Sequence, residues 1–272
     1  MDDDATDAVR PRFLRNAAAF VGGGIIGTLG GLIGLGGAEF RLPLLIGGFR
    51  FAALEAVILN KTMSLVVVAT ALPFRMTTVP MIDLAANWQV IFNLLLGSLA
   101  GAWLGAGWAT RLKSETLYRV IAVLLVGIAG ILLFGHDPTV AGHPLVTGWL
   151  QVIVGVAAGF GIGVVASLMG VAGGELLIPT IILLFGADVK LAGSLSLAVS
   201  LPTMIVGFAR YSRDQTFAVV RRNRTFLMVM AVGSIVGTFI GAQLVGAIPS
   251  DVLLPVLSMI LAISAIKVWR HK

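Results

Sequence analysis

The sequence predicts an all-α polytopic membrane protein made of two inverted-topology repeats. Of its 272 residues, 58% are hydrophobic and only 12% are charged, whereas a soluble domain carries about 25% charged residues. Intrinsic disorder is excluded, because a disordered chain is rich in charge and poor in apolar residues. Inside a bilayer the backbone must satisfy its own hydrogen bonds, so long apolar stretches are expected to be helices.

The apolar segments follow one order that occurs twice. Residues 17–35 would measure roughly 28 Å as a helix, enough to span a bilayer, whereas the next segment, residues 38–48, is too short to cross alone. Three full-length segments complete the first half, at residues 52–74, 88–109 and 117–134. The second half has the same order, with segments at residues 149–169, 176–185, 191–209, 226–245 and 252–268.

An internal repeat relates the two halves at a constant offset in the sequence. Glu39 and Pro43 coincide with Glu175 and Pro179, a match that the abundance of glycine cannot explain. Further along, once four residues are dropped from the first copy, Thr62-Met63-Ser64-Leu65 corresponds to Ser194-Leu195-Ser196-Leu197. The residues of the first copy that have an identical partner include Gly23, Gly27, Leu32, Gly34, Gly37, Glu39 and Pro43.

The distribution of lysine and arginine predicts the orientation of the segments. Four simple crossings per half would place Arg111, Lys113 and Arg119 outside, against the positive-inside rule. If each long-plus-short pair instead enters and returns, as two crossings or as a re-entrant hairpin, the outside keeps only Arg75 and Lys190. Each half then makes an odd number of passes, which gives inverted halves, as in many secondary transporters.

The resulting organisation has four parts. Residues 1–16 form a cytoplasmic N-terminal tail, residues 17–134 the first transmembrane repeat, residues 135–148 an external linker and residues 149–269 the second repeat. The apolar stretch that follows the tail is too long for the core of an ordinary signal peptide. We therefore expect a multi-pass protein of the cell (inner) membrane with both termini in the cytoplasm.

Two glycine pairs at the joints between long and short segments are candidate substrate-binding residues: Gly36 with Gly37, and Gly173 with Gly174. Glycine lets the chain leave a helix and lets backbone amides approach a ligand. A short helix that begins there would point its N-terminal amides, which favour anions, into the membrane. The alternative is that the glycines only permit close helix packing, which we favour for Gly23, Gly27, Gly101 and Gly105.

Each joint also carries a glutamate and, four residues later, a proline. Glu39 and Glu175 would serve as coupling or gating residues, because a buried carboxyl group can carry a proton. The alternative is that they cap the short helices by complementing free amides and the helix dipole. Pro43 and Pro179 are the expected helix-breaking positions.

Lys61 is a charged residue within an apolar segment. A lysine there costs at least about 2.5 kcal/mol, so it should face a partner or a water-filled cavity. Contact with an anionic substrate and a structural pairing, with Glu39 or Glu55 or by snorkelling to the surface, remain equal alternatives. Four hydroxyl residues are further candidates for binding an oxyanion: Thr62 and Ser64, which follow Lys61, and their counterparts Ser194 and Ser196 in the second half. The alternative is that these hydroxyls bond to their own helices.

Other classes of function lack their signatures in this sequence. Cysteine is absent, and the three histidines show no metal-ligand spacing, so we expect no metal site and no cofactor. Neither the GxSxG motif nor a phosphate-binding loop occurs, and an enzyme or an assembly scaffold is therefore the least favoured class. The basic residues lie at the ends of apolar runs, which argues against nucleic acid as a partner.

The duplicated joints, Gly36–Pro43 and Gly173–Pro179, resemble those of the sulfite exporter TauE/SafE family, as do the stretches Thr62–Leu65 and Ser194–Leu197. The resemblance extends over nearly the whole chain, from about residue 17 to residue 268. It implies a multi-pass transporter for sulfite, organosulfonates or related sulfur anions. Lys61 departs from the small residue usual at its position in the family and strengthens the expectation of an anion.

The predicted function is therefore secondary transport of a small sulfur-containing anion by proton-coupled alternating access between the two halves. The expected partners are this anion and the lipid bilayer. A passive channel for small anionic or neutral solutes is the alternative. The sequence leaves the direction of transport and the oligomeric state open, a homodimer included.

Overall fold

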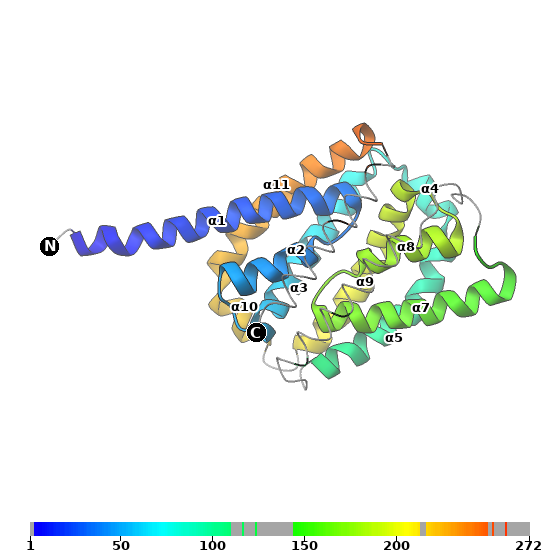
Figure 1. Cartoon of the computed structure of the whole chain (residues 1–272), viewed down its shortest axis with the longest axis horizontal. Helices are drawn as coiled ribbons and strands as arrows, with labels where there is room; N and C mark the ends of the chain where they lie inside the picture. The colour runs from blue at the N-terminus through cyan, green and yellow to red at the C-terminus, as the bar shows by residue number, and fades with distance from the viewer. Residues whose placement is uncertain are drawn as a thin grey trace.

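In a computed structural model of the chain, the described residues are 3–109, 144–212 and 216–249, together with the single positions 116, 123, 252 and 259. These residues form α-helices and one π-helical segment, and this part of the chain contains no strand (Figure 1). Six of the helices are long and apolar enough to cross a membrane, which confirms an all-helical polytopic protein. The predicted spans at 117–134 and 252–268 and most of the predicted linker lie outside the described residues.

The predicted order of long and short segments recurs in both halves. The first half contains α1 (Asp3–Ile33), α2 (Ala38–Pro43), the π-helical segment η1 (Leu44–Gly48), α3 (Ala53–Arg75), α4 (Met81–Ala86) and α5 (Trp88–Ala109). The second contains α7 (Gly148–Met169), α8 (Gly174–Phe185), α9 (Val189–Ser212), α10 (Thr216–Arg222) and α11 (Arg224–Ala247).

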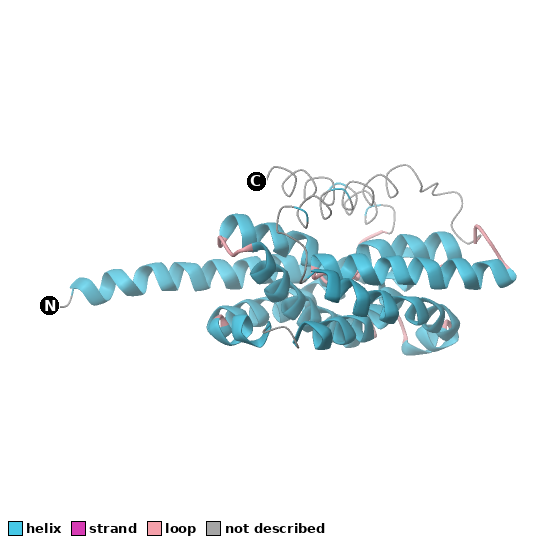
Figure 2. Ribbon diagram, turned by 90° about the horizontal axis from the view of Figure 1, so that it is seen from below, coloured by secondary structure: helices cyan, strands magenta, loops and turns pink. Residues whose placement is uncertain are grey.

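The helix α1 begins earlier than the first apolar segment. Residues 3–16, predicted as a tail, continue the helix without interruption, and this part projects beyond the other helices (Figure 2). Charged residues such as arginine are good helix formers, so the end of the apolar run is not the end of the helix. The candidate membrane span within α1 begins at Phe13.

In each half the short helix folds back beside the long one. In Figure 1, α1 runs from left to right and α2 returns, whereas α7 runs from right to left before α8 returns. Both short elements are followed by a residue in the left-handed conformation, Arg50 with φ 57° and Gly186 with φ 72°. These two positions correspond at the same offset that relates Glu39 to Glu175, so the internal repeat includes the backbone at the end of the short helix.

Glycine stripes join the two halves. Helix α1 packs against α11, and α5 packs against α7. Methyl groups added at Gly23 or Gly27 of α1 would collide with the backbone of α11, and methyl groups at Gly101 or Gly105 of α5 would collide with that of α7. The prediction that these four glycines serve helix packing is confirmed.

Helices α3 and α9 lie between these pairs and contact each other. They are antiparallel, because Lys61 in the N-terminal half of α3 lies against Gly207 near the end of α9, whereas Arg75 at the end of α3 lies against Gly193 near the start of α9. Each of the two helices also packs on a helix of the other half: α3 on α11, and α9 on α5.

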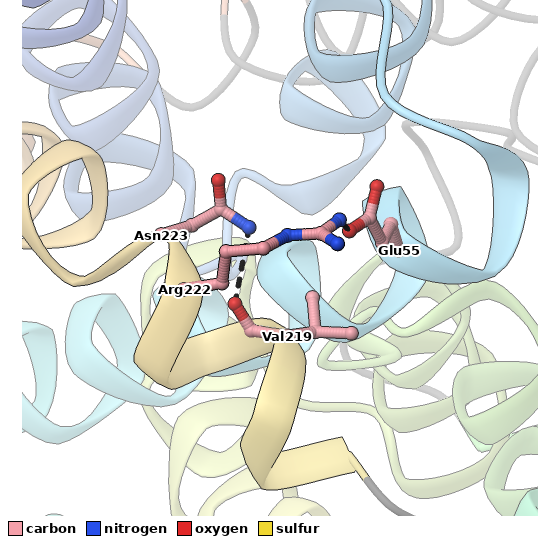
Figure 3. A network of polar contacts seen from close by, with 4 residues as sticks. All are labelled: Glu55, Val219, Arg222 and Asn223. Atoms are coloured by element: carbon pink, nitrogen blue, oxygen red, sulfur yellow. Dashed lines mark hydrogen bonds and ion pairs between the residues drawn. The ribbon is translucent and has the colours of Figure 1, made fainter.

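One end of α3 is tied to the second half at the surface of the molecule. Arg222, the last residue of α10, forms an ion pair with Glu55 in the first turn of α3 (Figure 3). The next residue, Asn223, donates a hydrogen bond to the carbonyl of Val219. The alternative pairing of Glu55 with Lys61 is therefore wrong: the partner of Glu55 is an exposed arginine.

Candidate functional site

Two glycine-containing breaks separate the long helices from the short ones. Gly34 and Gly37 have φ values of 89° and 65°, and Gly170 and Gly173 have φ values of 66° and 79°. The two pairs correspond at the offset of the internal repeat. Residues other than glycine rarely adopt this left-handed backbone conformation, which explains why both breaks have glycine at the same places.

The two breaks contact each other in the interior. A methyl group added at Gly36 would lie 2.7 Å from the Cβ of Ala172, and one added at Gly174 would lie 3.1 Å from the carbonyl oxygen of Gly34. The fold thus places the predicted glycine pairs of the two halves at one junction, which we call the glycine junction and define as residues 34–37 and 170–174.

The prolines lie beyond the breaks. Pro43 is the last residue of α2, and the chain continues directly as the π-helical η1. Pro179 lies within α8, which continues to Phe185. Because proline has no N–H group, neither proline can bond to the carbonyl four residues earlier, that of Glu39 or Glu175. The long and short helices are separated at the glycines.

The glutamates occupy equivalent positions at the starts of the short helices. Glu175 lies in the first turn of α8 and is 0% exposed. Glu39 is the second residue of α2, but its side chain lies outside the described part of the structure. A buried carboxylate in the first turn of a helix is favoured by the helix dipole, so the position of Glu175 suits both the capping and the coupling hypothesis.

The predicted hydroxyls are all bonded to the protein. Ser64 accepts a hydrogen bond of 3.1 Å from Nη1 of Arg41, and Ser196 donates one of 2.8 Å to the carbonyl of Gly34. Ser194 accepts a bond of 3.1 Å from Nε of Arg75. Thr62 donates to a carbonyl of its own helix. Ser64 and Ser196 therefore lie at the glycine junction, while Ser194 lies beside the end of α1. The bond that Thr62 makes among the described residues lies within its own helix.

Lys61 is buried in the N-terminal half of α3, whereas Arg75 is the last residue of this helix. Its Nζ donates a hydrogen bond of 3.3 Å to the hydroxyl of Ser167, which in turn donates to the carbonyl of Ala102. Ser167 lies in the last turn of α7, where a positive charge complements the helix dipole. This contact favours the structural alternative for Lys61, and binding of a substrate by Lys61 stays a prediction.

The burial of two arginines was not predicted from the sequence. Arg41 is 0% exposed and donates to Ser64 and, at 3.4 Å, to the carbonyl of Gly36. Arg75, predicted as a charge outside the membrane, is 1% exposed and bonds to the carbonyls at the end of α1. Arg41 could have been singled out from the sequence. An arginine within an apolar segment, here between Glu39 and Pro43, costs free energy in the membrane unless it has a partner or a functional role.

The six apolar helices and the paired helix breaks are those of a multi-pass membrane protein. The sulfite exporter TauE/SafE family matches residues 18–268, nearly the whole chain, and the protein belongs to this family of membrane transporters. No curated protein and no solved structure shows a significant match to the chain. Membership confirms the resemblance found in the duplicated joints and identifies the protein as a transporter.

Proposed function

We propose that the protein is a secondary transporter of a small sulfur-containing anion, such as sulfite or an organosulfonate. It works by proton-coupled alternating access between two inverted repeats, 17–134 and 149–269, joined by an external linker. It lies in the cell membrane with both termini in the cytoplasm. Membership of the sulfite exporter family supports the class of substrate.

The contact between the two helix breaks is the observation that carries the proposal. The glycine junction is made by equivalent segments of both halves and lies among six apolar helices. Broken helices that meet between two repeats are the usual binding place in secondary transporters, because half-helix ends and exposed backbone can hold an ion there. The start of α8 supplies such an end.

An exchange of contacts between α3 and α9 supports the inversion. The stretch of the sequence repeat that begins at Thr62 and Ser194 also relates Lys61 to Gly193, and it relates Arg75 to Gly207. In the fold the partners are exchanged: Lys61 lies against Gly207, and Arg75 lies against Gly193. Such an exchange of partners is expected when a two-fold axis relates the two halves. The equivalent helices α3 and α9 are antiparallel, as inverted repeats require.

Proton coupling is assigned to Glu175 and Glu39. Glu175 is buried beside the glycine junction, where a methyl group added at its neighbour Gly174 would lie within 3.1 Å of the backbone of the first break. A carboxyl group at such a place can take up a proton from one side and release it to the other, because ionisable residues inside membranes commonly form proton relays.

Uptake of labelled sulfite into proteoliposomes with an imposed pH gradient tests this function. The wild type is expected to show saturable flux that follows the gradient, and Glu175→Gln should lose the dependence on the gradient. Glu55→Gln is the matched control, because Glu55 pairs with an exposed arginine at the edge of the fold. Flux that neither saturates nor responds to pH would contradict the proposal and favour a passive channel.

A further inference from the structure

The side-chain amide of Asn60 is buried and forms no hydrogen bond with the described residues. It lies in α3 and is 0% exposed, and among the described residues neither its Nδ2 nor its Oδ1 has a hydrogen-bond partner. Buried side-chain polar groups are nearly always bonded, since an unbonded one loses its hydration without compensation. Where such a group lies beside a candidate binding site, a ligand that bonds to it would supply the compensation.

The face of α3 that carries Asn60 looks onto both helix breaks. Residues three and four apart share one face of a helix, so Val57 and Ser64 lie on either side of Asn60. A methyl group added at Gly170 would lie against Val57, and one added at Gly36 would lie 3.3 Å from the Cβ of Ser64. Asn60 is therefore placed between the contact with the second break and the contact with the first.

A buried cation lies on the same face. Arg41 bonds through Nη1 to Ser64, one helical turn from Asn60, and through Nη2 to the carbonyl of Gly36 in the glycine junction. A guanidinium group presents several donors in a planar fork that matches the oxygens of an oxyanion. Arg41, Asn60 and Ser64 thus bring a positive charge, an amide and a hydroxyl to one place.

We propose that Arg41, Asn60 and Ser64 bind the transported oxyanion. This inference rests on the proposed function and deepens it by naming the groups that hold the substrate. Arg41 supplies the charge, and the amide and hydroxyl groups donate to the oxygens. The amide oxygen of Asn60 accepts a hydrogen bond, so the site also suits a protonated oxyanion such as hydrogensulfite.

The test measures melting temperature and sulfite affinity together, on the purified full-length protein in detergent. Asn60→Leu removes the unbonded amide, so it should raise the melting temperature without ligand while weakening sulfite binding by roughly 10- to 100-fold. Ser64→Ala is a second variant, and it should likewise weaken the binding of sulfite. Sulfite titrated against the melting temperature gives the affinity, since binding to the folded state stabilises it.

Ser234→Ala is the matched control. Ser234 is a buried serine whose hydroxyl has no partner among the described residues, but it lies in α11 against Gly23 of α1, away from the glycine junction. Its replacement should leave the affinity for sulfite unchanged.

Two results would overturn the site: an Asn60→Leu protein that binds sulfite as tightly as the wild type, or one that melts lower without ligand. A wild type that neither sulfite, thiosulfate nor methanesulfonate stabilises contradicts the proposed function instead.

Discussion

Arg75 joins the end of α1 to the start of α9 through several hydrogen bonds. Its guanidinium donates to the carbonyls of Gly31 and Leu32 at 2.9 and 2.8 Å, to the carbonyl of Lys190 at 2.9 Å and to the hydroxyl of Ser194. The last carbonyls of a helix have no donor within the helix, and a positive charge there interacts favourably with the helix dipole. Arg75 therefore ends α1 and ties it to α9.

Replacement of Arg75 by leucine is expected to lower the free energy of unfolding by about 3 kcal/mol or more, because it leaves two buried carbonyls at the end of α1 without a donor. Chemical or thermal unfolding in detergent measures the loss. Arg222→Ala is the control: its side chain is 72% exposed in the pair with Glu55, and such pairs contribute about 1 kcal/mol or less. Equal losses for the two variants would refute this role.

Residues with tertiary partners were the hardest to predict from the sequence. Arg75 follows an apolar run, and the run alone suggests a charge outside the membrane. Its burial depends on carbonyls that lie more than forty positions away in the chain. Asn60 gave no signal either, because a lone asparagine in an apolar segment reveals neither its depth nor the presence of a partner. Glu175, Gly170 and Gly173, by contrast, could be found because the repeat pairs them with the identical residues Glu39, Gly34 and Gly37.

At the scale of elements, helix contact depends on glycine. In α11, methyl groups added at Gly233, Gly237 and Gly241 would all collide with the backbone of α1. Apolar side chains gain little from association in lipid, so close backbone approach and van der Waals packing must hold the helices together. The high glycine content of the sequence is largely explained by these contacts and by the two breaks.

Gly237→Ala is expected to destabilise the protein by about 1–3 kcal/mol, because the new methyl group would overlap the carbonyl of Gly24 and force the helices apart. Gly161→Ala in α7 is the matched control, since no atom outside its own turn lies within 4 Å of the added methyl group. It should leave stability unchanged or raise it slightly through helix propensity. Comparable destabilisation by both substitutions, in melting experiments on the two variants, would rule out this packing role.

The elements themselves were largely predictable, and their pairing was not. The hydropathy pattern located α3, α5, α7 and α9 because each is a long apolar helix. The offset of the internal repeat relates equivalent positions, but it does not say which helices touch. The contacts of α1 with α11 and of α5 with α7 join different halves, and they follow from the fit of glycine stripes in space.

At the scale of the whole molecule, the halves interlock. Each half contributes one helix to each glycine-rich pair, and the breaks of both halves form one junction between α3 and α9. A relative movement of the halves would therefore change the surroundings of the junction on both sides at once. This arrangement suits alternating access, in which one repeat rocks against the other around a fixed site.

A counterflow experiment tests whether the protein works by alternating access. Proteoliposomes loaded with unlabelled sulfite are diluted into a trace of labelled sulfite without any ion gradient. A carrier with one site that faces each side in turn exchanges label for unlabelled sulfite. We therefore expect a transient accumulation of label above equilibrium, and its loss in Asn60→Leu but not in Ser234→Ala. Label that only rises to equilibrium, as through an open pore, would contradict alternating access.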